Sequence, residues 1–575
     1  MQRRTFVKLG AAGIAGTLAG RVTGGEGAPP ETTTPAPGPW APASDVPPFD
    51  LAEATVADLQ QRMTAGEFTA ERLAQRYLER VTAVDRGSAG LNSLIEPNPE
   101  ALAVAAALDR ERKERGPRGP LHGIPVLIKD NIDTHDRMKT SAGSLALEAS
   151  IAPRDAFIVE RLRAAGAVIL GKTNLSEWAN FRSTRSTSGW SGRGGQTRNP
   201  YALDRNPCGS SSGSGAAASA NLCAAAIGTE TNGSIVCPSS ACGLVGIKPT
   251  VGLVSRTGII PISVSQDTAG PMARTVADAA ALLSAIAAAD PRDGATTRKA
   301  RPAPVDYTAS LDPAGLKGAR LGIVRRMFGE NEHVHEVTEA SIDALKQEGA
   351  VIVDPVVLTT QGKFDDAKFE VLLYEFKAGL NAYFASLGTS APVRSLEELI
   401  AFNERHRDRE MPYFAQEILI DAQKKGPLTT PAYRQARADC RRLSRTLGID
   451  AVMTKHRLDA LVAPTGDPAF PIDLVNGDHF TGGGASTPAA VAGYPHVTVP
   501  MGHVFGLPVG LSFFGKAWSE PTLITLAYAF EQATKARRPP QLRASAETGS
   551  GFQALGDRNQ ALGTSNCAPI ELSQP

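Results

Sequence analysis

A run of small residues between Gly209 and Ser234 constrains this chain more than any other part of its sequence. Two glycine-rich segments that carry serines, 209–215 and 228–234, flank an alanine-rich stretch. Glycine lets a backbone turn tightly and approach its surroundings closely, so both segments are expected to be tight turns. Neither segment contains a histidine. If these serines are nucleophiles, another kind of base has to activate them.

Lys129 is the candidate for that base, because it stands at the polar end of the apolar run 124–128. A serine hydroxyl is a poor nucleophile until a base takes its proton. A free lysine has a pKa of about 10.4, and burial lowers that value. Lys129, Ser210 and Ser234 can therefore perform acyl transfer without histidine. A plainer interpretation stays open at this point, in which the loops only turn the chain and Lys129 pairs with a neighbouring aspartate.

Other catalytic motifs do not fit the sequence. Residues 166–173 match the P-loop pattern letter for letter, but the residues between the two glycines, Ala-Val-Ile-Leu, suit a buried strand better than a phosphate-binding turn. The nine histidines form no HExxH motif, so no metal site is expected. The residues around Ser234, from Asn232 to Val236, do not form a GxSxG nucleophile elbow. We expect neither a metal nor an organic cofactor.

The charge composition argues against a nucleic-acid partner. The 60 Lys and Arg residues nearly cancel the 59 Asp and Glu residues. Four of the basic residues and one acidic residue lie in the first 27 positions, so the rest of the chain is close to neutral. A protein that binds a phosphate backbone usually carries a basic surface stripe, and none is apparent here.

The first 27 residues have the pattern of a twin-arginine (Tat) signal peptide. Arg3 and Arg4 precede Phe6 and a weakly apolar stretch, 9–20, without acidic residues. This stretch is shorter than the ~20 apolar residues that a membrane-spanning helix needs. We therefore expect export by the Tat machinery to the periplasm or the extracellular space, without stable membrane insertion. Residues 28–48, rich in proline and threonine, are expected to be a linker.

Residues 49–543 alternate between helical and strand patterns, which predicts an α/β domain. Apolar periodicity predicts helices at 55–84, 100–115, 156–165, 270–289 and 335–348. Short apolar runs predict strands at 124–128, 168–170, 318–324, 461–464 and 497–500.

Two further regions differ in composition from the rest of the chain. Residues 365–460 are charged and aromatic and are expected to be helical. They are either solvated helices whose aromatic residues pack inward or a cap that shapes a substrate pocket. Residues 544–575 are polar and are expected to be a terminal tail.

Six cysteines are too few for a disulfide scaffold in 575 residues, and no pair has CxxC spacing. Cys208, Cys237 and Cys242 lie in or beside the serine segments. The ordinary expectation is that they are small buried residues. A disulfide among them stays open if the protein is exported to an oxidising compartment.

Seven segments with long motifs follow one another through the chain: 123–130, 171–177, 206–217, 228–235, 243–250, 267–274 and 506–511. Together they resemble the amidase signature family over nearly all of the expected α/β domain. The resemblance implies a layered α/β/α fold with a central mixed β-sheet and a helical insertion at 365–460 that shapes the substrate site. It implies hydrolysis of carboxylic amides without a cofactor. The residues that mimic a P-loop belong partly to this pattern.

The resemblance also assigns roles to single residues. Lys129 matches the catalytic lysine and Ser234 the nucleophile. Ser210 matches the bridging serine, whose peptide bond is typically cis, and Ser211 is expected to support it. The matching oxyanion hole consists of backbone amides, those of Thr231, Asn232, Gly233 and Ser234. Ser212 and Ser214 are expected to be loop residues without a chemical role.

Two positions depart from the common pattern. Asn232 stands where many family members have glycine, and Val236 where many have arginine. The missing arginine removes a partner for a substrate carboxylate, which disfavours small acidic amides and an amidotransferase component. The run 228–267 is most similar to the peptide amidase branch, which removes carboxy-terminal amides from peptides.

The expected activity is therefore hydrolysis of a small-molecule or peptide amide through a Ser-Ser-Lys relay and an acyl-enzyme. Three alternatives stay open. The first is a general aryl or aliphatic amidase or an esterase with the same relay. The second is the amidase-like component of an amidotransferase, which needs a cytoplasmic partner and tRNA. The third is an inactive binding protein with this fold.

Overall fold

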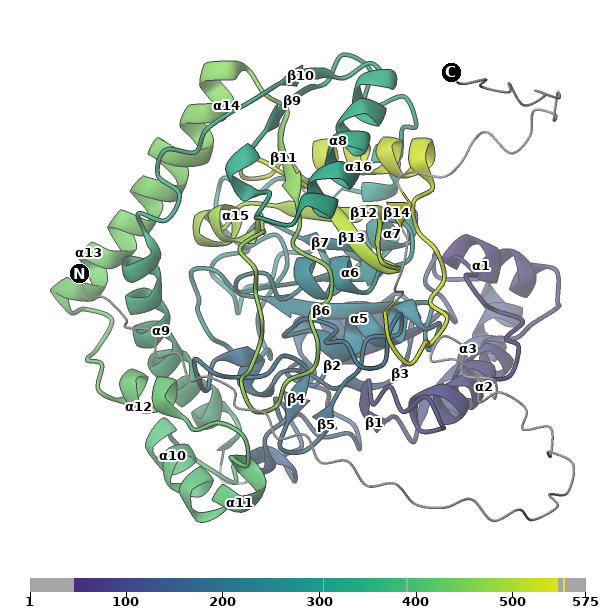
Figure 1. Ribbon diagram of the computed structural model, residues 1–575. Coiled ribbons are helices and arrows are strands. Elements are labelled where there is room, and N and C mark those ends of the chain that lie inside the picture. The colour runs from purple at the N-terminus through teal and green to yellow at the C-terminus, as the bar shows by residue number, and fades with distance from the viewer. Residues whose placement is uncertain (1–45, 304, 389–390, 547–551, 554–575) are drawn as a thin grey trace, which may run out of the picture. The chain divides into compact units, whose positions relative to one another are not determined.

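The computed structural model of the protein describes residues 46–303, 305–388, 391–546 and 552–553 (Figure 1). The expected signal peptide lies outside the described residues, as do most of the expected linker and tail. Every element below belongs to the expected α/β domain, except β14, which lies in the expected tail.

A large mixed β-sheet organises the described residues. It has 12 strands in the order β1-β3-β2-β6-β8-β7-β12-β13-β11-β9-β10, with β14 paired to β12. Strand β2 is parallel to β3 and β6, and β9 is parallel to β10 and β11. The remaining neighbours in this sheet are antiparallel. The predicted mixed sheet is thus confirmed.

The strands of this sheet and of a separate small hairpin have the following bounds: β1 Leu94–Pro97, β2 Pro125–Lys129, β3 Val168–Thr173, β4 Trp190–Ser191, β5 Gly195–Gln196, β6 Ala225–Glu230, β7 Val245–Lys248, β8 Thr268–Ala273, β9 Arg320–Ile323, β10 Val351–Val353, β11 Ala460–Pro464, β12 His496–Val504, β13 Leu507–Phe514 and β14 Phe552–Gln553. The α-helices are α1 Val56–Thr64, α2 Ala70–Arg80, α3 Ala101–Arg115, α4 Phe157–Ala164, α5 Ser212–Ser219, α6 Val236–Ala241, α7 Val276–Ile286, α8 Glu332–Gln347, α9 Asp365–Ser386, α10 Leu396–Arg405, α11 Arg407–Glu410, α12 Glu417–Gln423, α13 Pro431–Arg441, α14 Asp450–His456, α15 Ser486–Ala492 and α16 Glu520–Thr534.

Helices cover both faces of the sheet. On one face α5 and α6 contact each other, and between them they contact β6, β7 and β8. On the other face α7 contacts the same three strands, and α16 packs against α7 and α8. Both faces of the sheet are therefore buried, and the main hydrophobic core includes apolar residues from strands and helices of both layers. This is the predicted α/β/α layering.

The periodicity at 55–84 predicts one helix, but the structure divides it. Helix α1 ends at Thr64, and α2 begins after Thr69. The side chain of Thr69 accepts a hydrogen bond from the backbone N–H of Arg72, and Thr55 caps α1 in the same way. Threonine at an N-cap satisfies a donor that the first turn leaves free. The second cap, and not a change in the apolar stripe, marks the new helix.

The helix predicted at 270–289 is wrong over its first residues. Residues 268–273 form strand β8, which lies between β6 and β7, and the helix α7 starts only at Val276. A buried strand of small and apolar residues does not show the alternation of a half-exposed strand. Its sequence therefore runs into the helical pattern without a visible break.

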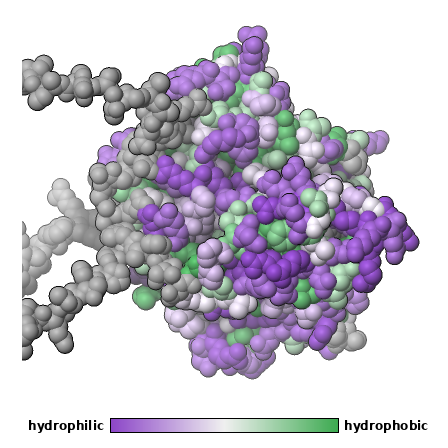
Figure 2. Space-filling model, turned by 90° about the vertical axis from the view of Figure 1, so that its right-hand side faces the viewer, coloured by the Kyte–Doolittle hydropathy of each residue, from purple (hydrophilic) through white to green (hydrophobic). Residues whose placement is uncertain are grey.

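The charged and aromatic region 365–460 is helical, as predicted, and contains α9 to α14. Its apolar residues, among them Phe376 and Phe384, form a second core with Trp178 and Phe181 of the α/β domain. No helix of the described residues is long and apolar enough to cross a bilayer. Figure 2 shows one face of the molecule, on which hydrophilic and hydrophobic residues are interspersed.

Candidate active site

Lys129 is the last residue of β2, a strand that lies between β3 and β6. Its side chain is fully buried, as its apolar lead-in predicts. Nζ lies 2.8 Å from Ser210 Oγ and 2.9 Å from Thr229 Oγ1, and it also contacts the Thr229 carbonyl at 3.3 Å. The neighbouring-aspartate interpretation is therefore wrong, because the ammonium group points at the serine segments. Thr229 is a partner that the sequence reasoning missed.

The environment of Lys129 favours its neutral form. Burial lowers its pKa to about 7, although the negative charges of Glu230 and Asp267 act in the opposite direction. Desolvation disfavours the charged form of any buried lysine. Near neutral pH a large fraction of Lys129 is thus able to accept a proton, which an ordinary lysine cannot do.

Ser210 follows a cis peptide bond between Gly209 and Ser210, as the resemblance implies. A side chain at position 209 would crowd this segment, because a Cβ there would lie 2.3 Å from Ser176 Oγ and one of the two would have to shift. The Ser210 carbonyl accepts a hydrogen bond from Ser176 N at 3.1 Å. The side chain of Ser210 is fully buried and faces Lys129.

Ser234 lies in the turn between β6 and α6 and is 8% exposed. A backbone hydrogen bond of 3.2 Å from Ser211 N to the Ser234 carbonyl joins this turn to the segment of Ser210. Within the described residues the hydroxyl of Ser234 makes no hydrogen bond, and the contact of Ser210 Oγ is with Lys129. Catalytic hydrogen bonds are often long before substrate binds. The structure therefore brings the two serine segments together and leaves the last contact of the relay unmade.

Glu230 organises the nucleophile turn, and the sequence reasoning gave it no role. Its carboxylate accepts hydrogen bonds from three backbone amides: Gly233 N at 2.8 Å, Ile235 N at 2.7 Å and Val236 N at 3.1 Å. The side chain is almost fully buried. Charge-assisted bonds of this kind are stronger than neutral ones, so Glu230 holds the turn around Ser234.

This arrangement changes the predicted oxyanion hole. The amide of Gly233 already has Glu230 as its acceptor, so it is not a free donor. No hydrogen bond from the amides of Thr231, Asn232 or Ser234 is present among the described residues. An oxyanion hole formed by these three amides stays a prediction.

Two side chains anchor the same turn from outside. Thr231 Oγ1 donates to Asp267 Oδ1 at 2.6 Å, and burial raises the pKa of Asp267 to about 6. Asn232 Oδ1 accepts from Ser486 Oγ at 2.9 Å, at the start of α15. Asn232 therefore has a positioning contact that a glycine at this place could not make.

The expectation that Ser212 and Ser214, two further serines of the first segment, are loop residues is wrong. Ser212 and Ser214 lie in α5 and are fully buried. Ser214 Oγ contacts Thr173 Oγ1 at 2.7 Å and the Ile227 carbonyl at 3.1 Å, which ties α5 to β3 and β6. Ser211 Oγ bonds the backbone of Thr229 as acceptor and donor, at 3.2 and 3.0 Å. Ser211 thus ties the segment of Ser210 to β6, and its supporting role in catalysis stays a prediction.

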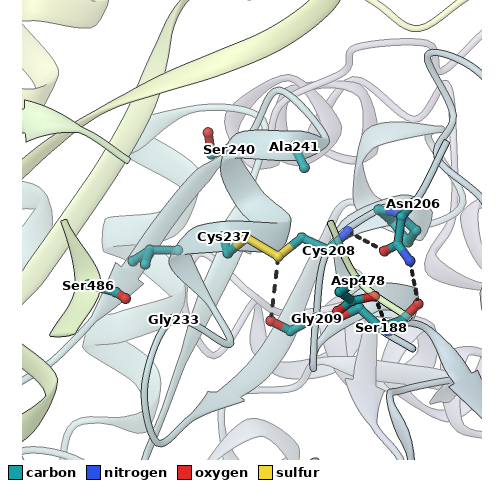
Figure 3. The surroundings of a disulfide bond; sticks show 12 residues. Ser188, Asn206, Cys208, Gly209, Gly233, Cys237, Ser240, Ala241, Asp478 and Ser486 are labelled. Carbon is teal, nitrogen blue, oxygen red and sulfur yellow. Dashed lines mark hydrogen bonds between the residues drawn. A yellow bond between two sulfur atoms is a disulfide. The ribbon is translucent and has the colours of Figure 1, made fainter. Parts of the chain in front are cut away.

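A disulfide connects the two serine segments (Figure 3). Cys208, just before Gly209, is bonded to Cys237 in α6, and their Cα atoms are 5.9 Å apart. The expectation of unpaired buried cysteines is wrong for this pair, while Cys223, Cys242 and Cys440 are free and buried. Which cysteines meet depends on how the segments pack, and the sequence does not carry that information.

A buried Ser–His contact exists away from these residues. His496 Nε2 lies 2.6 Å from Ser512 Oγ. Burial lowers the pKa of His496 to about 3, and neither residue lines the pocket beside Ser234. His496 and Ser512 therefore belong to the packed sheet, and they are not an alternative to Lys129 and its serines as the catalytic residues.

A pocket of ≈570 Å³ opens beside Ser234. Its wall contains the turn 231–234, the disulfide and several apolar side chains, namely Phe181, Val236, Ile262, Leu372, Phe470 and Phe480. The helical region 365–460 contributes Leu372, whereas the loop between β11 and α15 contributes many of the other residues. This loop was missed in the sequence, where its Gly482-Gly-Gly run is the only signal. Pockets of this size accept small ligands and short peptides.

Comparisons with known proteins place the chain among amidases. The family model described as Amidase matches residues 72–524. A crystal structure of a peptide amidase with the competitive inhibitor chymostatin is 58% identical, with a TM-score of 0.83, and the match covers 86% of this chain and 100% of that one. The native peptide amidase from Stenotrophomonas maltophilia is 57% identical, with a TM-score of 0.82 and coverage of 86% and 99%. A probable amidase from Arabidopsis thaliana is 42% identical over 502 residues, which are 86% of this chain and 92% of the relative. The chain therefore belongs to the amidase signature family, and it is an amide hydrolase.

Proposed function

We propose that this amide hydrolase is a peptide amidase, which releases ammonia from the carboxy-terminal amide of a peptide. The observation that carries the proposal is the likeness to peptide amidases at 57–58% identity over 99–100% of their chains. The ≈570 Å³ pocket with its apolar wall supports it, because it has room for the last residues of a peptide.

The proposed reaction begins with neutral Lys129. It takes a proton from Ser210 while Ser210 takes the proton of Ser234, whose Oγ forms a bond to the carbonyl carbon of the amide. The 2.8 Å contact between Nζ and Ser210 Oγ supports the first part of this relay. The second part needs the Ser234 hydroxyl to rotate toward Ser210 when substrate binds.

The negative charge on the carbonyl oxygen is proposed to rest on the free amides of residues 231, 232 and 234. Such donors stabilise charge best when they are already oriented, and the hydrogen bonds that the side chains of Glu230 and Asn232 accept hold the turn in place. Collapse of the intermediate breaks the C–N bond, and the relay returns its proton to the departing ammonia. Water then attacks the acyl-enzyme, gives a proton to the same relay and releases the peptide acid.

An ester substrate could use the same relay, because it differs only in the leaving group. An aryl or aliphatic amide would also fit the apolar wall. The similarity to peptide amidases favours peptide amides over these alternatives and over a role as an amidotransferase component.

The direct experiment compares one acetylated peptide as its amide, its methyl ester and its free acid. Ammonia release and the mass of the product are measured for each substrate. The proposal expects ammonia from the amide and the free acid as product, with no cleavage of internal peptide bonds. Hydrolysis of the ester without release of ammonia from the amide would contradict peptide amidase activity.

We also propose export through the Tat pathway to the periplasm or the extracellular space. The pattern of Arg3, Arg4 and Phe6 supports it, and so does the Cys208–Cys237 disulfide, since disulfides persist in oxidising compartments. Replacing both arginines by lysine should retain the protein in the cytoplasm of a bacterial host with a Tat system. Unchanged export of that variant would contradict the proposal.

A further inference from the structure

The pocket beside Ser234 has an unbalanced charge. Among the described residues that line it, Asp467 carries the one carboxylate, and none is lysine or arginine. His479 is another titratable residue of the wall, but it is half exposed and lies 3.1 Å from Asp473. It therefore faces a carboxylate of its own and does not neutralise Asp467.

Asp467 stands in the loop that follows β11, and its charge has no cationic partner among the described ion pairs. Its Oδ2 accepts hydrogen bonds from Thr481 Oγ1 at 2.5 Å and from Gly483 N at 3.2 Å. Its Oδ1 is buried and has no hydrogen-bond partner among the described residues. The carboxylate is thus held at the pocket wall by neutral donors, and no lysine or arginine lies beside it among the described residues of that wall.

A second carboxylate lies just behind the wall. Asp478 accepts hydrogen bonds from the backbone and hydroxyl of Ser188, at 2.9 and 2.5 Å, and Ser188 lines the pocket. Burial raises the pKa of Asp478 to about 6, so it is largely ionised at neutral pH. Both carboxylates give the pocket a negative potential, and the apolar side chains around it screen that potential poorly.

From this arrangement we propose that Asp467 determines which charge the acyl part of the substrate can carry. The inference rests on the proposed peptide amidase function. Peptide amides whose last residue is neutral or cationic are accepted, and those with an acidic last residue are rejected. The reaction converts a neutral amide into a carboxylate in the same pocket, so Asp467 also disfavours binding of the product acid. Specificity of this kind arises from repulsion as much as from attraction.

The test uses three acetylated dipeptide amides that end in leucine, glutamate or lysine. With the native protein at neutral pH, kcat/KM for the glutamate amide is expected to be about tenfold below that for the leucine amide, the size of a like-charge penalty across a partly solvated pocket. In Asp467→Asn the glutamate penalty is expected to vanish. The asparagine keeps an oxygen for Thr481 and Gly483, so the loop retains its contacts. Asp467→Glu, which keeps the charge, is expected to keep the penalty.

Asp421→Asn is the matched control, because it removes the same charge from the exposed surface of α12. It should leave all three ratios as they are in the native protein. Inhibition by the dipeptide acid ending in leucine gives a second readout, and its inhibition constant should fall in Asp467→Asn. If Asp467→Asn keeps the native ratios and the native product inhibition, the proposal is overturned. If the native protein hydrolyses none of the three amides, peptide amidase activity itself fails, which is a distinguishable result.

Discussion

The Nζ atom of Lys129 lies 2.8 Å from the hydroxyl oxygen of Ser210, and both side chains are completely shielded from solvent. A lysine in this position shares its proton with a serine and not with a carboxylate. Because burial lowers its pKa to about 7, it can serve as a base at neutral pH.

The rate should therefore depend on the protonation of Lys129. Its neutral form is the base, so kcat/KM is expected to fall as the pH drops below about 7 and to level off above it. Lys129→Met should remove nearly all activity, since no other base contacts Ser210 among the described residues. A pH series with one neutral peptide amide measures both effects. A rate that stays flat down to pH 4 would show that Lys129 is not the base.

Glu230 is expected to act as a positioning residue for Ser234. Glu230→Gln keeps the size of the side chain but removes charge-assisted bonds to three amides, each worth roughly 1.5–3 kcal/mol. We expect kcat to fall by about tenfold to a hundredfold, with a smaller change in KM.

If Glu230 only held the fold, Glu230→Gln would leave the pH profile of the rate unchanged. We expect the profile to shift instead. The negative charge of Glu230 raises the pKa of Lys129, so its loss lowers that pKa and shifts the acid limb to lower pH. An acid limb that stays in place or moves to higher pH would contradict this account.

The disulfide between Cys208 and Cys237 should hold the two serine segments against each other and so stabilise the folded protein. It spans 29 residues, and the entropy of closing such a loop corresponds to about 3–4 kcal/mol of unfolding free energy. A reductant is expected to lower the melting temperature and the activity of the native protein. The double variant Cys208→Ser/Cys237→Ser should start at the lower values and be insensitive to reductant. If the native protein and the double variant respond equally to reductant, the loss of stability and activity does not come from this disulfide.

Asn232 gives a finer test of the nucleophile turn. Asn232→Gly restores the residue that many family members carry and removes the contacts with Ser486 and Thr487. Added backbone freedom in the turn is expected to lower kcat several-fold with little change in stability. Ser486→Ala, which removes one of these partners, should give a smaller effect in the same direction. Wild-type kcat in both variants would show that Asn232 does not hold the turn.

Lys129, Ser210 and Ser234 could be named as candidates from the sequence because each lies in a short motif that resembles the amidase signature. Glu230 and Asp467 could not. The first looks like one more polar residue of a turn, and its role depends on where three amides point. The second reaches the pocket through a loop that is 233 positions away from Ser234.

The α/β fold class could be predicted because helical and strand patterns alternate along the sequence. The predictions that were wrong concern features that depend on packing. Strand β8 is buried on both faces and shows no alternation, so its sequence predicts the start of a helix. Cys208 and Cys237 meet because the two serine segments fold against each other. Neither fact is encoded in residues that are neighbours in the sequence.

The central claim is that Ser234 is the nucleophile, and a serine-directed fluorophosphonate probe tests it most directly. The native protein should take up one probe, located on Ser234 by peptide mass spectrometry, and lose amide hydrolysis in proportion. Ser234→Ala should remain folded, take up no probe and show no turnover. Labelling at another residue, or substantial amide hydrolysis by folded Ser234→Ala, would contradict the account.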